Sequence, residues 1–238
     1  MRRARPTLTN ISTIAETRWL KLESLKYTDA KNQERSWDRV SRVTPQGTED
    51  SNDDPADAVA IFPLLKKFGS NVIQTVLVKQ YRPPLDAFTI ELPAGLIDAG
   101  ETPQQCAIRE LKEETGYIAK LSDCQLSGTL PLSPGLSNES VKFCTVSVDM
   151  AANQNPVQDL EESEDIELIL VDLNDLESVL HELAKEERTK IFLGLWTLAR
   201  GMTIGKQMMR MSNGTTSQQE SSGESESERG DAHDSSKL

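Results

Sequence analysis

Residues Gly95–Tyr117 read GLIDAGETPQQCAIRELKEETGY, and they combine clear structural signals with a cluster of charged side chains at 109–114. Thr102 is a favourable helix N-cap, Pro103 suits the first helical position, and Gln105 stands where a capping-box partner belongs. Gly116 is a natural residue to end a helix in the left-handed conformation. The stretch therefore predicts a tight loop followed by one helix that ends just before Gly116.

Ala107, Ile108 and Leu111 form the apolar stripe of this helix. Three glutamates, Glu110, Glu113 and Glu114, lie beside it. Their spacing of i, i+3 and i+4 places them on one flank, where like charges cost about 0.2–0.5 kcal/mol per pair. A solvated helix tolerates that cost, so the cluster alone could be an ordinary exposed face. Carboxylates converging from one helix are also what Mg²⁺ takes together with water and substrate phosphates. Both interpretations stay open at this point.

The overall charge limits the possible partners. The 238 residues contain 38 Asp and Glu against 26 Lys and Arg, a formal net charge of -12. Nucleic-acid binding needs a basic surface, so we expect no nucleic-acid partner. An acidic enzyme can act on a phosphate anion if metal ions reverse the sign of the charge locally. No run approaches 18 apolar residues, so we also expect no membrane span.

The cysteines and the N-terminal sequence indicate in which cellular compartment the protein is expected. Cys106, Cys124 and Cys144 show no CxxC spacing, and we expect reduced thiols in a cytoplasmic protein. Met1–Ala15 carries three arginines, several Ser and Thr and no acid, which weakly resembles a mitochondrial transit peptide. We favour an ordinary frayed terminus instead, while a nuclear or mitochondrial pool stays open.

Composition shifts divide the chain into five segments. We expect a flexible N-terminus (1–17), an antiparallel β element (18–47), an acidic linker (48–57), a main domain (58–205) and a disordered Ser/Glu-rich tail (206–238). Periodicity in the main domain predicts strands at 59–65, 72–78, 88–92, 126–132, 141–148 and 166–171, and helices at 172–187 and 189–200. Strands interleaved with helices predict an α/β fold whose mixed sheet is covered on both faces.

The Gly95–Tyr117 stretch resembles the Nudix box, G-x5-E-x7-R-E-U-x-E-E-x-G-U, where U is a bulky apolar residue. All nine specified positions match: Gly95, Glu101, Arg109, Glu110, Leu111, Glu113, Glu114, Gly116 and Tyr117. The resemblance implies a Nudix hydrolase with an α/β/α sandwich fold. It further implies that Mg²⁺, for which Mn²⁺ can substitute, is held by Glu110, Glu114, Glu113 and the Ala94 carbonyl. Arg109 would pair with Glu101 and orient the loop.

Flanking segments narrow the resemblance. KQYRPP at 79–84, ELPAG at 91–95 and SPGLSNE at 133–139 look like the eukaryotic ADP-ribose pyrophosphatase branch, whose marker is a proline about sixteen residues beyond the box, here Pro134. The resemblance runs from about Trp19 to Met202. It implies hydrolysis of ADP-ribose, and of related ADP-sugars, with ADP-ribose giving AMP and ribose 5-phosphate. The alternatives are a Nudix enzyme for another nucleoside diphosphate derivative, such as an oxidised nucleotide, and a non-catalytic ADP-ribose sensor, against which the intact box acids count.

In that branch the N-terminal sheet exchanges between two subunits, and two tryptophans sandwich the adenine. The resemblance therefore implies a homodimer with Trp19 and Trp37 on the base, Arg42 and Arg82 on phosphates, and Glu91 near the ribose or the metal. Gly135 and Leu136 complete the expected substrate-binding set. Plain core packing remains the alternative for the tryptophans, and a surface cation for each arginine.

The attacking water needs a general base. The branch takes it from a loop after the central strands, and we assign Glu164, with Glu161 and Glu162 as alternatives in the same acidic loop. Arg109 and Glu113 complete the expected catalytic set.

Overall fold

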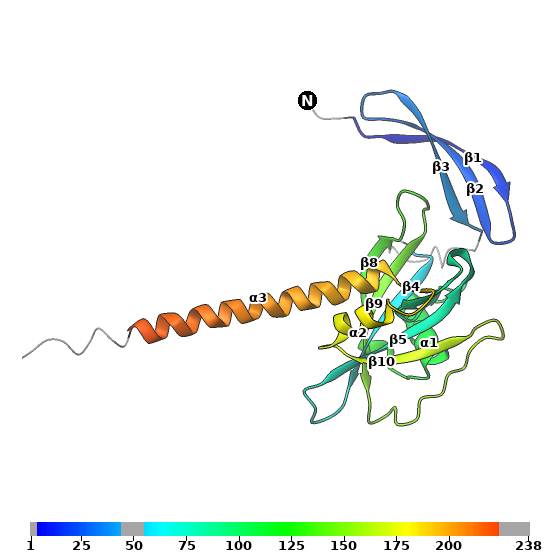
Figure 1. Cartoon of the computed structure of the whole chain (residues 1–238). Coiled ribbons are helices and arrows are strands. Elements are labelled where there is room, and N and C mark those ends of the chain that lie inside the picture. The colour runs from blue at the N-terminus through cyan, green and yellow to red at the C-terminus, as the bar shows by residue number, and fades with distance from the viewer. Residues whose placement is uncertain (1–3, 44–54, 224–238) are drawn as a thin grey trace, which may run out of the picture.

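The computed structural model of the chain describes residues 4–43 and 55–223, with side chains described as far as residue 212. A three-stranded sheet at the N-terminus stands beside a larger α/β domain, from which the long helix α3 projects (Figure 1). Within the described ranges, no helix is long and apolar enough to cross a bilayer.

The N-terminal sheet is an antiparallel meander of β1 (Thr7–Glu16), β2 (Leu20–Thr28) and β3 (Glu34–Arg42). The predicted β element is therefore present, and its last residues, 44–47, lie outside the described ranges. The expected flexibility of residues 1–17 is wrong for Thr7–Glu16, which pairs with β2 along its whole length. Every residue of β1 is exposed, so the strand has no buried alternation that a sequence pattern could reveal.

The domain is built on one mixed sheet. Its strand order is β11-β6-β5-β4-β9-β8, while β10 pairs with β5 and β7 pairs with β4. The β4–β9 and β6–β11 pairs are parallel and the others are antiparallel. The bounds are β4 Ala58–Lys66, β5 Ile73–Arg82, β6 Ala87–Glu91, β7 Ala94–Leu96, β8 Cys124–Pro131, β9 Ser140–Asp149, β10 Ile166–Asp172 and β11 Thr189–Ile191, with short 3₁₀ turns at Pro83–Leu85 and Leu121–Asp123.

Two hydrophobic cores cover the two faces of this sheet. Successive β4 residues divide between them: Ile61 packs in the core with helix α1 (Pro103–Thr115), and Phe62 in the core with α2 (Leu176–Leu183) and α3 (Leu193–Gly223). Side chains that alternate along a strand reach opposite faces, so helices are needed on both sides. The predicted α/β/α sandwich is confirmed.

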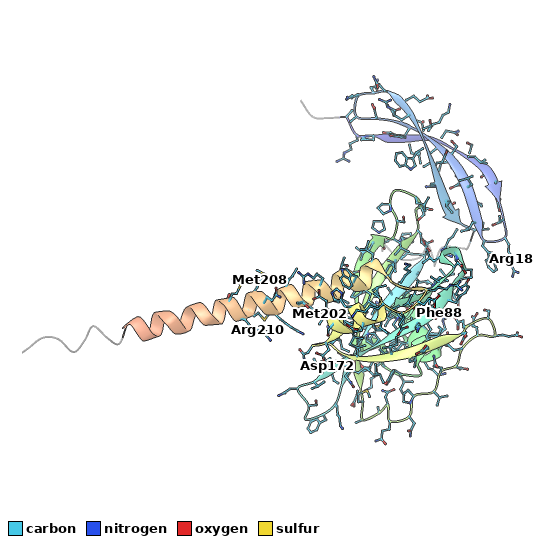
Figure 2. All side chains as sticks on the ribbon, in the orientation of Figure 1. Arg18, Phe88, Asp172, Met202, Met208 and Arg210 are labelled. Atoms are coloured by element: carbon cyan, nitrogen blue, oxygen red, sulfur yellow. The ribbon has the colours of Figure 1, made fainter. Side chains whose placement is uncertain are left out.

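The C-terminal elements differ from their predicted bounds. Residues 189–191 form β11 rather than a helix, because they pair in parallel with β6. Helix α3 then continues to Gly223, so the expected disorder is wrong for 206–223, and residues 224–238 lie outside the described ranges. A helix that is already formed propagates more readily than it nucleates, which extends α3 beyond the residues that pack on the domain. Met202 lies against the domain, whereas Met208 and Arg210 lie on the projecting part (Figure 2).

The acidic linker ends earlier than predicted. Residues 48–54 lie outside the described ranges, but Ala56 is buried in the core of the domain. The Asp57 carboxylate accepts hydrogen bonds from the Ser140 backbone N–H at 2.8 Å and its hydroxyl at 3.0 Å, which anchors β4 beside β9. The three cysteines are free thiols, and the Cys124 and Cys144 sulfurs lie 2.9 Å apart.

Candidate active site

Helix α1 begins and ends where its sequence predicts. The Thr102 hydroxyl accepts from the Gln105 N–H at 3.3 Å, and the Gln105 side chain accepts from the Thr102 N–H at 2.9 Å, which completes the capping box. Gly116 ends the helix at φ 74°, in the left-handed region. A Cβ on Gly116 would also fall 2.3 Å from the Val157 nitrogen, so the residue must be glycine for two reasons.

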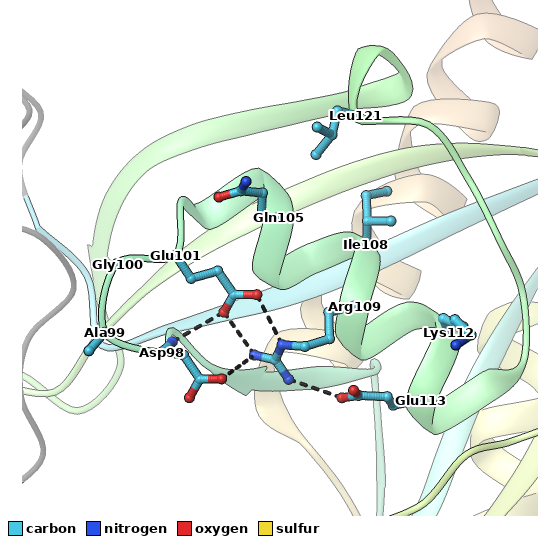
Figure 3. A pocket seen from close by; sticks show the side chains of 10 residues that line it. All are labelled: Asp98, Ala99, Gly100, Glu101, Gln105, Ile108, Arg109, Lys112, Glu113 and Leu121. Carbon is cyan, nitrogen blue, oxygen red and sulfur yellow. Dashed lines mark hydrogen bonds and ion pairs between the residues drawn. The ribbon is translucent and has the colours of Figure 1, made fainter.

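Arg109 joins the loop before the helix to the helix itself. Its guanidinium makes two 2.9 Å hydrogen bonds to Glu101, the expected pairing (Figure 3). It donates to the Leu96 carbonyl at 3.1 Å. It also donates to Glu110 at 2.6 Å and Glu113 at 3.0 Å. The pKa of Arg109 is raised, first by the hydrogen bond to Glu101 and then by the other carboxylates. The loop and the three-glutamate face are thus held by one permanently charged side chain.

Glu110 and Glu114 are buried acids at the same place. Glu114 is only 3% exposed and accepts from the Ala94 N–H at 2.9 Å. Burial raises the pKa of Glu114 to about 8, and the charges of Glu110 and Glu164 add to the shift. Burial likewise raises the pKa of Glu110. Two buried carboxylates disfavour each other's charge, so a cation bound beside them would stabilise their charged forms.

Gly95 lies directly against Glu110. A Cβ at this position would fall 1.8 Å from the Glu110 Oε1, so the backbone and the carboxylate occupy the space that any side chain would need. This close approach is a second sign that the loop and the buried acids form one site. The buried oxygens fit a hard divalent cation. In the described part of the chain, however, no three acidic, His or Cys side chains converge as a ready-made metal cage.

The other two expected metal ligands, Glu113 and the Ala94 carbonyl, do not face Glu110 and Glu114 in the expected way. Glu113 is turned towards Arg109, and the contact that Ala94 makes with Glu114 comes from its N–H rather than its carbonyl. A metal would therefore find only Glu114 unpaired with Arg109, and both Glu110 and Glu113 would need to share or exchange that partner.

Arg82 and Glu91 bring a second charged pair to the site from β5 and β6. They form two hydrogen bonds of 2.9 Å, and the Thr89 hydroxyl also donates to Glu91. Burial tends to raise the pKa of Glu91, but Arg82 and Thr89 outweigh it and the pKa is lowered. The pKa of Arg82 is raised, chiefly by its hydrogen bond to Glu91 and further by the charges of Glu114 and Glu164. Arg82 therefore lies within electrostatic reach of the buried acids.

Among the three loop acids, Glu164 is the one that the structure brings towards this cluster. Its charge raises the pKa of both Glu110 and Glu114. Its side chain is partly buried, whereas Glu161 and Glu162 are exposed. Its carboxylate accepts from the Glu161 N–H at 3.0 Å, which holds the turn.

The expected substrate residues of the N-terminal sheet meet the loop at 133–139 of the same chain. The indole N–H of Trp37 donates to the Gly135 carbonyl at 3.3 Å, and the Val40 N–H donates to the Leu136 carbonyl at 2.9 Å. Arg42 pairs with Glu139 at 2.6 Å. The sheet is thus attached to the domain along the outer edge of β3.

Trp19 and Trp37 are not brought together. Both are more than half exposed, and Trp19 lies under the Arg18 guanidinium, 4.3 Å from its ring centre. The Val43 N–H donates to the Trp19 carbonyl, whereas Trp37 pairs with Leu25. Six residue positions separate the two tryptophans along the sheet, which is about 20 Å at about 3.3 Å per residue. One chain cannot place both rings on the same base.

A hollow of about 690 Å³ opens on the outer side of α1 (Figure 3). Of the expected site residues only Arg109 and Glu113 line it, so it is distinct from the cluster of Glu110, Glu114, Glu164 and Arg82. Its lining comprises Asp98, Ala99, Gly100, Glu101, Gln105, Ile108, Arg109, Lys112, Glu113 and Leu121.

Sequence reasoning missed two supporting residues. Thr89 lies two positions before Glu91 on the same face of β6, and that alternation could have indicated it. Gln158 contacts the end of α1 across 44 positions of sequence, and no local signal indicates it.

Buried acids on a helix, a glycine loop against them and a nearby arginine are groups that suit metal-assisted chemistry on phosphates. The family comparison agrees: residues 54–193 match the NUDIX domain. The chain belongs to the Nudix family. Nudix hydrolases generally need a divalent metal ion.

Several known proteins are similar over most of the chain. The ADP-ribose pyrophosphatase of Saccharomyces cerevisiae is 34% identical over 200 residues, which is 83% of each chain. The ADP-sugar pyrophosphatase of Mus musculus is 35% identical over 186 residues, covering 77% of this chain and 81% of the mouse protein. A crystal structure of an ADP compounds hydrolase aligns with a TM-score of 0.57 at 18% identity, over 87% of this chain and 98% of that one, and shows the shared fold.

Proposed function

We propose that this protein is a Mg²⁺-dependent hydrolase of ADP-ribose and related ADP-sugars, converting ADP-ribose to AMP and ribose 5-phosphate. The observation that carries the chemistry is the buried pair Glu110 and Glu114, with Glu164 and Arg82 close by. The names of the yeast and mouse relatives support the choice of substrate.

Glu110 and Glu114 would hold the Mg²⁺, with Glu113 and the Ala94 carbonyl as further ligands, and Mn²⁺ as a substitute. A bound divalent cation neutralises the diphosphate and polarises the phosphorus under attack. Arg109 keeps the loop against the helix and thereby keeps Gly95 and Glu110 in contact.

The remaining residues act on the substrate and the water. Arg82 and Arg42 present guanidinium groups that are paired with carboxylates, Glu91 and Glu139, and phosphate oxygens are alternative partners of the same geometry. Glu91 lies near the ribose or metal and keeps Arg82 in place. Glu164 takes a proton from the attacking water as the water oxygen bonds to one phosphorus of the diphosphate. The bond from that phosphorus to the bridging oxygen breaks, and the bridging oxygen leaves with the other phosphate.

We further propose a homodimer in the cytoplasm, with no nucleic-acid partner. Its N-terminal sheets exchange, so that each sheet makes with the other copy the contacts to residues 133–139 that the single chain makes with itself. Leu8, Ile11, Leu22 and Trp37 of the sheet are exposed apolar side chains, a surface that a second copy could cover. Because Trp19 and Trp37 are about 20 Å apart in one chain, an adenine sandwich needs one ring from each subunit. Gly135 and Leu136, which contact β3, would line that site.

The function is tested by measuring AMP release from ADP-ribose with Mg²⁺ and after chelation. We expect turnover only with the metal, and a higher kcat/KM for ADP-ribose than for an oxidised nucleoside diphosphate. A preference for the oxidised nucleotide would favour the alternative Nudix activity. Binding of ADP-ribose without turnover would favour a sensor.

The base assignment predicts a difference between three neighbouring glutamates. Glu164→Gln should lose most of kcat with little change in KM, because the amide cannot accept the proton. Glu161→Gln and Glu162→Gln are the matched controls, since both side chains are exposed in the same loop. A loss confined to either control would move the base to that residue.

A further inference from the structure

The last turn of α1 is tied to the segment that leads to Glu164. The final carbonyls of a helix have no partner within it. Here the Glu113 carbonyl accepts from the Asp159 N–H at 2.8 Å, and the Glu114 carbonyl accepts from Gln158 Nε2 at 2.7 Å. Two residues that carry site carboxylates are thus held at their backbone by residues 158 and 159.

The same Gln158 amide closes the loop that follows it. Its Nε2 also donates to the carbonyl of Ile166, the first residue of β10, at 3.1 Å. Both donors of one amide nitrogen therefore have an acceptor. Residues 159–165 therefore form a loop whose two ends, at Gln158 and at Ile166, are joined by the Gln158 side chain. Glu164 lies two positions before Ile166.

A close approach fixes the chain just before this amide. The space in which Gly116 would carry a Cβ is filled by the backbone of Val157, with the nitrogen 2.3 Å away. This contact and the Asp159 N–H locate the start of the segment. The Gln158 side chain extends that placement to the far end of the loop, at Ile166.

We propose that Gln158 is a positioning residue, which sets Glu164 relative to Glu110 and Glu114 by joining the helix to both ends of the loop. The inference rests on the proposed function, because it takes Glu164 to be the base. A displacement of about 1 Å in a catalytic group can cost about 10²-fold in rate. Gln158 needs no contact with the substrate to have such an effect.

The direct test is Gln158→Met, which keeps the length and removes both donors. We expect kcat for ADP-ribose to fall by about 10- to 100-fold with KM little changed. Gln154→Met is the matched control, because that exposed glutamine donates only a 3.5 Å hydrogen bond to Ala151, within its own turn. Gln158→Lys supplies N–H donors again and should recover part of kcat.

The readout that separates positioning from a general structural role is the double variant of Gln158→Met with Glu164→Gln. If Gln158 acts through Glu164, the double variant loses no more kcat than Glu164→Gln alone. Losses that multiply would overturn the proposal, and so would wild-type kcat in Gln158→Met.

Hydrogen exchange on the full-length protein without substrate tests the same two hydrogen bonds of Gln158. Residues 159–165 should exchange faster in Gln158→Met than in Gln154→Met, while the buried amides of α1 should not differ. Unchanged exchange would overturn the inference. Failure of the wild-type protein to release AMP from ADP-ribose would instead count against the proposed function, so the two failures are distinguishable.

Discussion

Glu114→Gln is expected to lower kcat by about 10³ or more, roughly 4 kcal/mol of barrier. The substitution removes one negative oxygen from the buried pair and leaves Glu110 alone to hold the cation. Saturating Mg²⁺ should not restore turnover, because the remaining carboxylate would no longer hold the cation in the position from which it polarises the phosphorus. Steady-state kinetics over a Mg²⁺ titration measures this.

The loss should not come from unfolding. A Gln oxygen can still accept from the Ala94 N–H, and the amide is neutral, as the protonated form that burial favours for Glu114 is in the absence of metal. In the presence of chelator the variant should therefore melt no lower than the wild type. Glu182→Gln, on an exposed part of α2, is the control for the substitution itself. Near-wild-type turnover in Glu114→Gln would refute the metal-ligand assignment.

Trp37→Ala is expected to raise KM for ADP-ribose by about tenfold to a hundredfold, because stacking on a base is worth about 1–3 kcal/mol. The stacking would be equal in ground and transition states, so kcat should fall little. Trp37→Phe separates stacking from the hydrogen bond to Gly135: it keeps an aromatic face, loses the N–H donor, and should retain most of the affinity.

Removal of residues 1–43 extends this test to the subunit contact. If the adenine site is shared, the truncated protein should be monomeric and should no longer bind ADP-ribose. Size-exclusion chromatography with light scattering, together with KM, measures both. A monomer with unchanged KM would contradict the shared site and return both tryptophans to a structural role.

The box region could be predicted because its signals are local. Thr102, Gln105 and Gly116 fix the ends of α1 through contacts within a few residues, and Arg109 meets Glu101 only eight positions away. The two-faced alternation of the central strands likewise predicts helices on both sides of the sheet. For these parts of the fold the predicted element types agree with the structure, and the predicted bounds differ from it by only a few residues.

Other parts depend on partners far away in sequence. β11 looks helical in isolation and becomes a strand because it pairs with β6, about a hundred positions earlier. β1 has no buried face, so its existence depends on its backbone pairing with β2. The role of Gln158 at the site could not be predicted for the same reason, because only folding brings its two acceptor carbonyls close to it.

The contact between Gly95 and Glu110 also limits how this sequence can drift. The smallest possible side chain, one methyl group, would fall 1.8 Å from the Glu110 Oε1, so any replacement of this glycine displaces a carboxylate that we propose holds the metal. Any descendant that acquires another residue there must move either the loop or the acid. A related chain lacking this glycine would therefore be a candidate for having abandoned the reaction while keeping the fold.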